Sequence, residues 1–462
     1  MITQLNKPFF ITILLTALLL LAYGHTFNFP FQFDDYKVIV DEPKVHSVSA
    51  WWQSMPGMRP LLKLSYALNW QFDQSATYFR LINWLVHGLN SGLVGLLSLK
   101  LLAKFSPQTL QPQAIALLAA LLFALHPAHS EVVVYISSRS TALMGLFSLA
   151  AIICALHAFA AKSRAKYYLS LAFILFLVAL SIKESALILL FILLIIKLFY
   201  IKNTAKISAQ YAFKIGLIFI AALAFAGILL VQIPRYAELL AKMFSAPDIH
   251  TILLNQGVAH AHYLSRTLLG LDLNVDYQLA VPALLNVQML IIWAALIALL
   301  VLAWLLRNAK PLISLCIVWW FVWLLPTNSI LQRVDLISDR QIYMASIGPI
   351  ILLSVWLVGF TNKLPQLKLA LATILFAYCF GATWLRASDY ASEISLWQAS
   401  VEQEASNPRA WNNLGYALML DKKYVQAQIA FENALQLDEN HYRAFYNLQD
   451  VKSRMLDSKI LK

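Results

Sequence analysis

The 462-residue sequence has little charge, since only 13% of its residues are Asp, Glu, Lys or Arg, against about 25% in ordinary soluble domains. Hydrophobic residues make up 60% of the chain, which excludes a soluble globular protein and a disordered chain. The sequence also lacks periodic glycine and a sustained heptad pattern, so collagen-like and coiled-coil structures are excluded. The three cysteines, Cys154, Cys316 and Cys379, all lie in long apolar runs, so neither a disulfide framework nor a cysteine-based metal site is expected. What remains is a polytopic membrane protein.

Long apolar runs recur along the chain. Because one membrane span takes about 20 apolar residues, they predict an all-α membrane bundle of about 11 spans. The runs lie at roughly 8–25, 81–103, 113–127, 140–161, 167–182, 185–200, 215–232, 286–306, 311–326, 342–360 and 367–386. Two of them meet at Lys183-Glu184, as one hairpin or as partly re-entrant segments. The first run lacks a small-residue cleavage site, so we expect it to be retained as an anchor.

The basic residues are distributed asymmetrically between the two sides of the predicted membrane. If the N-terminus is cytoplasmic, the inward-facing segments contain no acidic residue and the following basic ones: Lys7, Lys100, Lys104, Lys162, Arg164, Lys166, Lys197, Lys202, Lys206, Lys214, Arg307, Lys310, Lys363 and Lys368. This bias predicts that the N-terminus is inside and that the C-terminus, after an odd number of spans, is outside. The net charge of +12 therefore reports orientation, and no nucleic-acid partner is expected. With its modest length and bare loops, the chain is expected in a bacterial inner membrane, with a periplasmic C-terminal domain.

The composition becomes polar after Arg386, so we predict a membrane domain over 1–386 and a second domain over 387–462. Residues 408–441 follow the tetratricopeptide pattern of two antiparallel helices, with packing positions Trp411, Leu414, Gly415, Ala427, Phe431 and Ala434. A second repeat starts at Tyr442 and stops after one helix. Because about three repeats are needed for a stable array, we expect this tail to lean on the membrane domain or on a helix at 388–405. Its expected role is to hold or present a polypeptide.

Phe33-Asp34-Asp35-Tyr36 is the first polar cluster on the predicted outward side. If the backbone here is extended, adjacent carboxylates point in opposite directions, so Asp34 and Asp35 do not form the facing pair of a hydrolase. Either one can still act as a single general base, or both can contribute to a metal site. A capped turn at the start of a surface helix is the alternative.

The second cluster is His-Pro-Ala-His-Ser-Glu at 126–131, where Pro127 ends one helix and His126, His129 and Glu131 form a compact polar group. The histidine spacing without a helix to carry it disfavours a zinc site, and a hydrogen-bonded turn between helices is the alternative. Ser138-Arg139-Ser140 then opens the next span. An always-charged guanidinium at this place predicts an anionic partner.

Lys183-Glu184 and the segment 333–343, which contains Asp339, Arg340 and Tyr343, complete the outward polar set. Local pairing of Lys183 with Glu184 and of Asp339 with Arg340 is one interpretation. The convergence of acids and cations on one side favours another, in which Arg139, Lys183 and Arg340 hold an anionic lipid headgroup and a carboxylate handles a proton. The long loop at about 233–285 contains two helix-forming segments, 235–244 and 260–270, and so predicts helices that lie in the outer interface.

Several elements occur in an order typical of one family: Phe33-Asp34-Asp35-Tyr36, Arg59-Pro60-Leu61 with Ser65-Tyr66 and Leu68-Asn69, the 126–131 stretch with Ser138-Arg139-Ser140, Lys183-Glu184, Leu273-Asn274-Val275-Asp276-Tyr277, and Asp339-Arg340-Gln341-Ile342-Tyr343 before Ser346-Ile347-Gly348. The ordered set resembles the transmembrane-and-tetratricopeptide O-mannosyltransferases and their bacterial relatives, within the GT-C glycosyltransferases. The resemblance implies a GT-C-like helical bundle and an inverting transferase. It also implies three partners: a polyprenyl-phosphate-linked sugar, membrane lipid, and an acceptor protein such as a pilin or another exported protein.

Carried over by position, the resemblance makes Asp34 or Asp35 the catalytic base, with Glu131 helping to position acceptor or donor. It implies substrate-binding roles for Arg59, His126, His129, Arg139, Lys183, Glu184, Asp339, Arg340 and Tyr343. A divalent metal held by Asp35 and Glu131 stays open, and no other cofactor is implied. The sequence departs from the family in reading Asp339-Arg340 where Glu-Arg is usual, and in its much shorter repeat array.

Other functions also fit the sequence. One is transfer of a sugar or oligosaccharide to lipid A or another glycan, and another is a non-catalytic membrane scaffold whose repeat recruits partners. The tetratricopeptide tail favours a protein acceptor. A transporter is disfavoured because the interiors of the predicted spans contain almost no ionisable residues.

Overall fold

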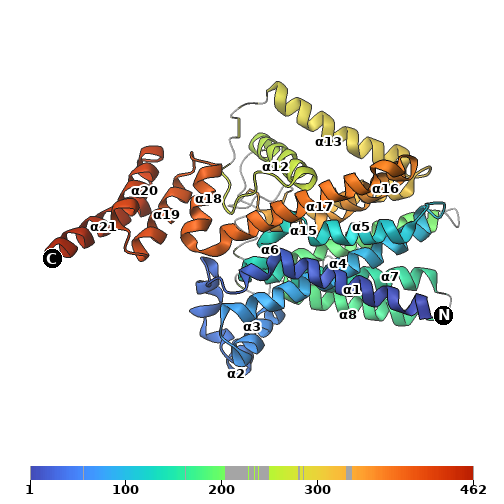
Figure 1. The fold of residues 1–462 in the computed structure, drawn as a ribbon, viewed down its shortest axis with the longest axis horizontal. Coiled ribbons are helices and arrows are strands. Elements are labelled where there is room, and N and C mark those ends of the chain that lie inside the picture. Colours follow the sequence, from blue (N-terminus) through green and yellow to red (C-terminus); the bar gives the residue numbers. More distant parts are fainter. Residues whose placement is uncertain are drawn as a thin grey trace.

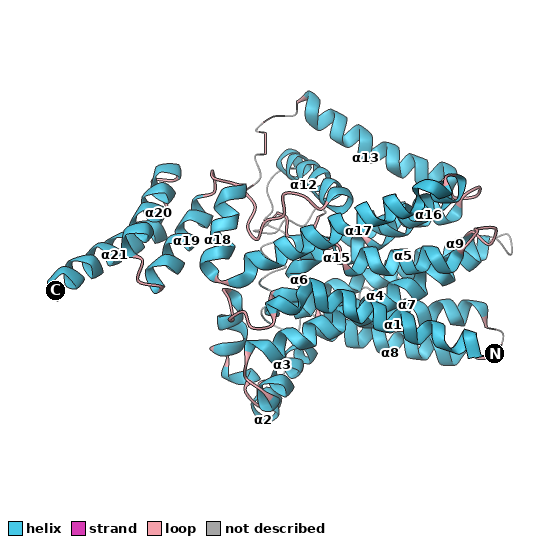
Figure 2. Ribbon diagram, in the orientation of Figure 1, coloured by secondary structure: helices cyan, strands magenta, loops and turns pink. Residues whose placement is uncertain are grey.

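The computed structural model describes residues 2–202 apart from 56 and 162, residues 249–328 apart from 279, 280, 283 and 285, residues 336–460, and the single positions 227, 234 and 238. Within these residues every regular element is a helix, which confirms the all-α prediction (Figure 2). The helices of the apolar part form a bundle, and the last helices of the chain project from one end of it (Figure 1). The two chain termini consequently lie at opposite ends of the longest axis.

Helices occupy the predicted apolar runs apart from 215–232, which lies outside the described residues except for position 227. They are α1 (Ile2–Tyr23), α4 (Ala76–Phe105), α5 (Pro112–Ala124), α7 (Arg139–Ala160), α8 (Ala165–Ile182), α9 (Ile188–Lys202), α13 (Val287–Leu306), α14 (Pro311–Leu324), α16 (Ile347–Lys363) and α17 (Pro365–Ser388). Five helices of the described residues are long and apolar enough to cross a membrane, or up to seven if each bent pair is one span. The span total therefore stays a prediction, as does the domain boundary at 386, which falls within the last turn of α17.

Two of the apolar segments are sharply bent, and both bends carry predicted site residues. The axis turns by 52° between α5 and the segment Pro127–Val134, which includes α6 (Ser130–Val134), and by 59° between Asp339–Ala345 and Ile347–Thr361. Pro127 accounts for the first bend because it lacks an N–H and restricts the residue before it. Beyond the second bend, Gly348 lets α16 approach α14 closely, since a Cβ there would lie 2.3 Å from the Cys316 carbonyl oxygen.

Two of the predicted inward-facing lysines, Lys100 and Lys104, contact the ends of neighbouring helices. Lys100 Nζ at the end of α4 lies 2.9 Å from His157 Nε2 at the end of α7. Lys104 Nζ lies 3.8 Å above the Tyr200 ring near the end of α9. These contacts place the ends of three helices side by side, as the predicted topology requires, although the structure contains no membrane.

The first predicted outward loop folds into short helices: η2 (Tyr36–Val40), η3 (Pro43–Val45), α2 (Val48–Gln53) and α3 (Pro60–Phe72). The extended backbone assumed for Asp34-Asp35 is wrong, because both residues are helical and lead directly into η2. The long loop further on contains α12 (Ile249–Leu269), so the helix predicted around residues 260–269 is present. The other expected helix of that loop, at 235–244, lies outside the described residues except for position 238.

The C-terminal tail consists of α18 (Glu393–Gln403), α19 (Pro408–Leu420), α20 (Tyr424–Leu437) and α21 (Tyr442–Ile460). The α19–α20 pair is the predicted repeat, and Gly415 is needed where the helices cross because a Cβ there would lie 2.6 Å from the Phe431 ring. Trp397 and Val401 of α18 belong to the same hydrophobic core as the repeat. The tail thus leans on the predicted helix at 388–405, which supplies the apolar surface that a lone repeat lacks.

Candidate active site

A cavity of about 410 Å³ lies between the predicted outward end of the bundle and the tail. The bundle and its loops contribute Phe33, Asp34, Glu131, Tyr135, Val275, Asp276, Ile337, Ser338 and Arg340. The tail contributes Trp397, Arg409, Asn412, Asn413, Asp438, Asn440, His441, Tyr442 and Arg443. The volume falls within the range of about 300–1,000 Å³ of small-molecule sites. Of the predicted site residues, Asp34, Glu131 and Arg340 line this cavity.

Asp34 is the carboxylate of the first loop that faces the cavity. Phe33 before it has a left-handed backbone with φ of 46°, which is unusual for an aromatic residue. The Asp34 N–H donates to Tyr135 Oη at 3.0 Å and so fixes the start of the helical turn. Among the described residues no donor hydrogen-bonds to the half-buried Asp34 carboxylate. Its oxygen lone pairs are consequently available to a ligand.

Asp35 has a different environment, because its side chain is fully buried. Its Oδ1 accepts a hydrogen bond from Ser137 N at 2.7 Å and its Oδ2 accepts one from Gln32 N at 3.2 Å. Burial raises the pKa of Asp35 to about 7, against the opposing effects of these two N–H donors and of the Arg80 charge. Asp35 therefore fastens the first loop to the turn before α7 rather than facing the cavity.

Glu131 and Arg340 come from the two bent segments and meet at the cavity wall. Glu131 is only 3% exposed, and its Oε2 accepts a hydrogen bond from Arg340 N at 2.9 Å. Ser338 Oγ donates to the same carboxylate at 3.3 Å, and Arg340 Nη1 lies 3.5 Å from Glu131 Oε1. The guanidinium keeps 28% of its surface exposed. Glu131 thus holds a partly accessible cation at the cavity.

Local pairing of Asp339 with Arg340, one of the two interpretations from the sequence, does not occur. Asp339 is almost fully buried, accepts a hydrogen bond from Tyr277 Oη at 2.5 Å and lies 3.3 Å from Arg386 Nη2. Successive side chains of the short helix η7 (Asp339–Gln341) point in different directions, so Asp339 faces α17 while Arg340 faces Glu131. Asp339 is therefore a buried neighbour of the cavity wall.

Arg59, Lys183 and Glu184 form a second polar group beside the cavity. Arg59 Nε and Nη2 donate to the two Glu184 carboxylate oxygens at 3.0 and 2.5 Å. Burial opposes ionisation of Glu184, but the Arg59 charge outweighs it and lowers the pKa of this carboxyl to about 2. Lys183 Nζ donates to Thr141 Oγ1 at 2.7 Å. Glu184 therefore pairs with a distant arginine, and Arg59 lies within electrostatic range of Arg340.

Four other predicted site residues are buried inside the bundle. Arg139 donates to neutral oxygen atoms of Asn83, Ser65, Asn69 and Phe79. Tyr343 Oη lies 2.8 Å from His87 Nδ1 and accepts from Asn90 Nδ2 at 2.9 Å. His126 Nε2 lies 3.1 Å from Thr267 O, and His129 Nε2 lies 3.1 Å from Ser346 Oγ. The two histidine contacts match the alternative of a hydrogen-bonded turn between helices. The anionic partner predicted for Arg139 is wrong, because this buried guanidinium is held by neutral oxygen atoms. None of the four residues lines the 410 Å³ cavity.

The residues around Asp35 and Glu131 do not support the metal site that the sequence left open for these two carboxylates. The described residues contain no group of three or more His, Cys, Asp or Glu side chains that would hold a metal ion. Both carboxylates are already occupied by the N–H and O–H donors described above.

Several residues at the site were not assigned a role from the sequence. Arg80 at the start of α4 donates to the backbone oxygens of Phe29, Pro30 and Val134 and so ties the first loop to α6. Its place just before an apolar run was the available signal. Asp276 and Tyr277 belong to a stretch that the resemblance includes but to which it gives no role. Arg409 has no sequence signal, since it is one of several basic residues of the tail.

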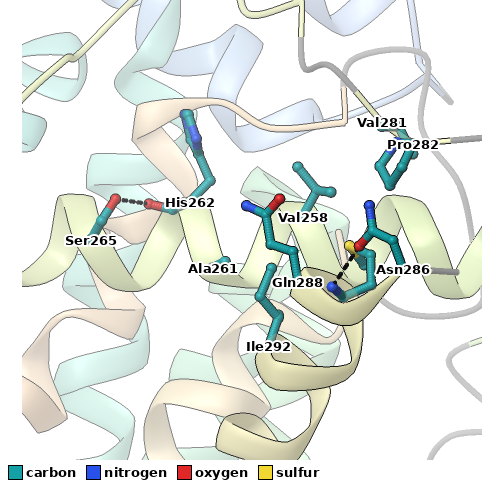
Figure 3. A pocket seen from close by; sticks show the side chains of 10 residues that line it. Val258, Ala261, His262, Ser265, Val281, Pro282, Asn286, Gln288 and Ile292 are labelled. Atoms are coloured by element: carbon teal, nitrogen blue, oxygen red, sulfur yellow. Dashed lines mark hydrogen bonds between the residues drawn. The ribbon is translucent and has the colours of Figure 1, made fainter.

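A second cavity of about 500 Å³ lies between α12, α13 and the segment that joins them (Figure 3). His262 and Ser265 of α12 and Gln288 and Ile292 of α13 contribute to its wall. None of the predicted site residues lines it. Three of the predicted site residues, Asp34, Glu131 and Arg340, instead line the cavity beside the tail.

Comparison with known proteins gives one match to a family and two to relatives. Residues 408–441 match the tetratricopeptide repeat family, which confirms the predicted repeat and its bounds. "Protein O-mannosyl-transferase F38B6.6" of Caenorhabditis elegans is 29% identical over 157 residues, which are 30% of this chain and 22% of that protein. "Protein O-mannosyl-transferase Tmtc3" of Drosophila melanogaster is 26% identical over 175 residues, 35% of this chain and 18% of that protein.

The chain thus resembles two proteins named as protein O-mannosyl-transferases, and it contains a tetratricopeptide repeat of its own. This confirms the resemblance drawn from the ordered motifs. The matched stretch spans only about a fifth of the length of each of these two relatives. No solved structure matches the chain.

Proposed function

We propose that this chain is a membrane glycosyltransferase that moves one sugar from a polyprenyl-phosphate donor to a hydroxyl group of a protein. The observation that carries the proposal is one shared cavity, lined by the partly exposed Arg340 guanidinium and by the Asp34 carboxylate, which accepts no hydrogen bond from the described residues. The names of the two relatives support mannose as the sugar and protein as the acceptor.

In the proposed reaction the acceptor oxygen attacks the anomeric carbon of the sugar while Asp34 takes the hydroxyl proton. The bond between that carbon and the phosphate oxygen breaks, and its electron pair leaves with the polyprenyl phosphate. Arg340 neutralises the charge that develops on this oxygen, and Arg59 adds a second positive charge nearby. Attack on the face opposite the phosphate inverts the configuration at the anomeric carbon.

The proposal assigns different roles to the two adjacent aspartates. Asp34 faces the cavity and is the base, whereas Asp35 is buried and positions the loop that carries Asp34. Glu131 positions Arg340 rather than taking part in the proton transfer, because its carboxylate already accepts from Arg340 N and Ser338 Oγ. Arg139, His126, His129 and Tyr343 are left out of the reaction, since their polar atoms bond within the bundle.

The proposed setting is the predicted one: a bacterial inner membrane with the cavity and tail on the periplasmic side. Two measurements test the function. Purified protein in detergent, given polyprenyl-phosphate mannose and a Ser- and Thr-rich peptide, should add one hexose to the peptide by intact-mass analysis. Exported proteins of cells with and without the chain should differ by the same increment. An unchanged mass in both experiments would leave the membrane scaffold as the better interpretation, and an altered glycolipid would favour transfer to lipid.

A further inference from the structure

The segment Leu273–Tyr277, here called the strap, contacts both walls of the cavity. It follows α12 and lies between the bundle and the tail. Its sequence, Leu-Asn-Val-Asp-Tyr, belongs to the ordered set of the resemblance, and the proposed chemistry leaves it unused. The contacts of its individual residues show what it does in the structure.

Asp276 is the strap residue that holds the tail. Its carboxylate is 7% exposed and accepts a hydrogen bond from Arg409 Nε at 2.6 Å, with a second bond from the same guanidinium. Asn407 Nδ2 donates to the backbone and side-chain oxygens of Asp276 at 3.3 Å. Both partners stand at the start of α19, where Asn407 caps the helix with its own side-chain oxygen. A two-pronged arginine–carboxylate contact fixes orientation as well as distance.

Neighbouring atoms of the strap add to this hold on the tail. Asn274 Nδ2 donates to the Ser400 carbonyl oxygen of α18 at 3.3 Å, and Val275 packs against the hydrophobic core of the repeat. Just after the strap, Gln278 N donates to Glu404 Oε2 at 3.0 Å. The first helices of the tail are therefore bonded to the strap at several points.

Tyr277 points the other way, toward the bundle. Its hydroxyl donates to Asp339 Oδ1 at 2.5 Å and accepts from Asn274 N at 2.7 Å. Burial holds the pKa of Tyr277 well above its usual range, so the hydroxyl stays protonated and continues to donate. Asp339 immediately precedes Arg340, which faces the cavity. The tail residues that line the cavity are here called the tail wall. Asp276 thus binds the tail wall, and its neighbour Tyr277 binds the segment that carries Arg340, the proposed phosphate-binding residue.

The tail wall is suited to a peptide. Asn412 Nδ2 donates to Asn413 Oδ1 at 3.2 Å, and Asn412 Oδ1 accepts from Asn447 Nδ2 at 3.0 Å. This arrangement leaves the Asn413 amide nitrogen, which among the described residues donates no hydrogen bond, at the cavity wall. A side-chain amide complements the N–H and C=O groups of an extended backbone. The tail also projects beyond the end of the bundle (Figure 1), so in the predicted topology it lies on the aqueous side of the membrane.

We propose that the tail forms the acceptor wall of the reaction cavity, that this wall binds an extended polypeptide segment, and that Asp276 and Tyr277 are positioning residues that keep it in register with Arg340. The proposal rests on the proposed function for the reaction, but the binding of a peptide to the tail wall does not depend on turnover. The repeat is accordingly part of the site and not a remote recruitment module.

The test uses the full chain in detergent and a fluorescein-labelled, unstructured peptide rich in Ser and Thr. Fluorescence anisotropy should show that Asp276→Asn and Arg409→Ala each weaken peptide binding by about tenfold, the effect of losing about 1.4 kcal/mol. The double variant should bind no more weakly than either single variant, because both changes remove the same contact. Asp272→Asn is the matched control, since it removes the same charge next to the strap from an exposed side chain.

Kinetics with polyprenyl-phosphate mannose separate the two ends of the strap. Asp276→Asn should act mainly by raising KM for the peptide, and Tyr277→Phe, which loses the bond to Asp339, should act mainly by lowering kcat. Arg409→Ala keeps the test valid if Asp276→Asn does not fold, because the Arg409 side chain is half-exposed.

The possible results distinguish this proposal from the proposed function. Unchanged anisotropy in both Asp276→Asn and Arg409→Ala, or equal effects of Asp276→Asn and Tyr277→Phe on KM and kcat, overturns the acceptor wall. An absence of mannose turnover in the unmodified chain, with peptide binding still sensitive to Asp276, overturns the proposed function and leaves the acceptor wall in place.

Discussion

Replacing Asp34 by Asn tests the proposed base most directly. Asparagine has nearly the same shape and keeps the backbone N–H that donates to Tyr135 Oη, so the helical turn should form as before. No described donor contacts the Asp34 carboxylate, so the fold loses no hydrogen bond through the change. What disappears is the ability to take the acceptor's proton.

The size of the effect follows from the role. A positioned general base contributes about 10²–10⁴ in rate, which corresponds to about 2.7–5.5 kcal/mol of the activation barrier. We therefore expect kcat for mannose transfer to fall by about 10²–10⁴ in Asp34→Asn, with the thermal unfolding temperature unchanged. The assay is transfer of radiolabelled mannose from polyprenyl-phosphate mannose to a Ser- and Thr-rich peptide.

Asp41→Asn is the matched control, because Asp41 is exposed at the end of η2 and does not line the cavity. It removes the same charge from the same loop and should retain full activity. If Asp34→Asn keeps more than about a tenth of the kcat of the unmodified chain, a loss of less than about 1.4 kcal/mol, Asp34 is not the base. A folded Asp35→Asn variant with the larger loss would transfer the role to Asp35.

Three further predictions test separate parts of the structure. Burial raises the pKa of Asp35 from 3.8 to about 7, so the folded state binds a proton more tightly than the unfolded state. The free energy of unfolding should therefore fall as the pH rises from about 4 to about 7. Thermal unfolding in detergent should show this decline, and Asp35→Asn should abolish it. Gly415→Ala would force a Cβ to within 2.6 Å of the Phe431 ring and should destabilise the tail by about 1–3 kcal/mol, seen as faster limited proteolysis. Gly92→Ala, in a helix with nothing within 4 Å of the new Cβ, is its control and should show no such effect. Arg340→Gln should lower kcat by about 10²–10³ if the charge of Arg340 stabilises the leaving phosphate. Arg340→Lys keeps the charge and should lose less activity. A greater loss in Arg340→Lys than in Arg340→Gln would refute that role.

Much of the architecture was predictable from the sequence because it depends on local patterns. Apolar runs of span length are helical wherever the structure describes them, since a chain that buries its backbone in lipid must form internal hydrogen bonds. The repeat at 408–441 was predictable from the spacing of small and large packing residues such as Gly415 and Phe431. The order of short polar motifs was enough to indicate the resemblance to protein O-mannosyl-transferases.

The tertiary structure alone decided which polar residues meet. Asp34 and Asp35 are adjacent and chemically identical. Ser137 and Gln32 hold the buried Asp35, whereas the half-buried Asp34 lines the cavity, and only the tertiary structure distinguishes the two. Local pairing of Asp339 with Arg340, one of the two interpretations from the sequence, does not occur because the short helix η7 points the two side chains apart, toward Arg386 and Glu131.

The strap illustrates the same limit. The sequence placed Asp276 in one of the motifs shared with the family it resembles. Its pairing with Arg409 could not be predicted, because Arg409 lies more than a hundred residues away and resembles any other surface cation. Pairings between distant segments depend on how helices pack and bend, which the periodicity of one segment does not encode. The sequence determined the elements and the membrane character of this protein, and the packing of bundle against tail decided which of its charges share a site.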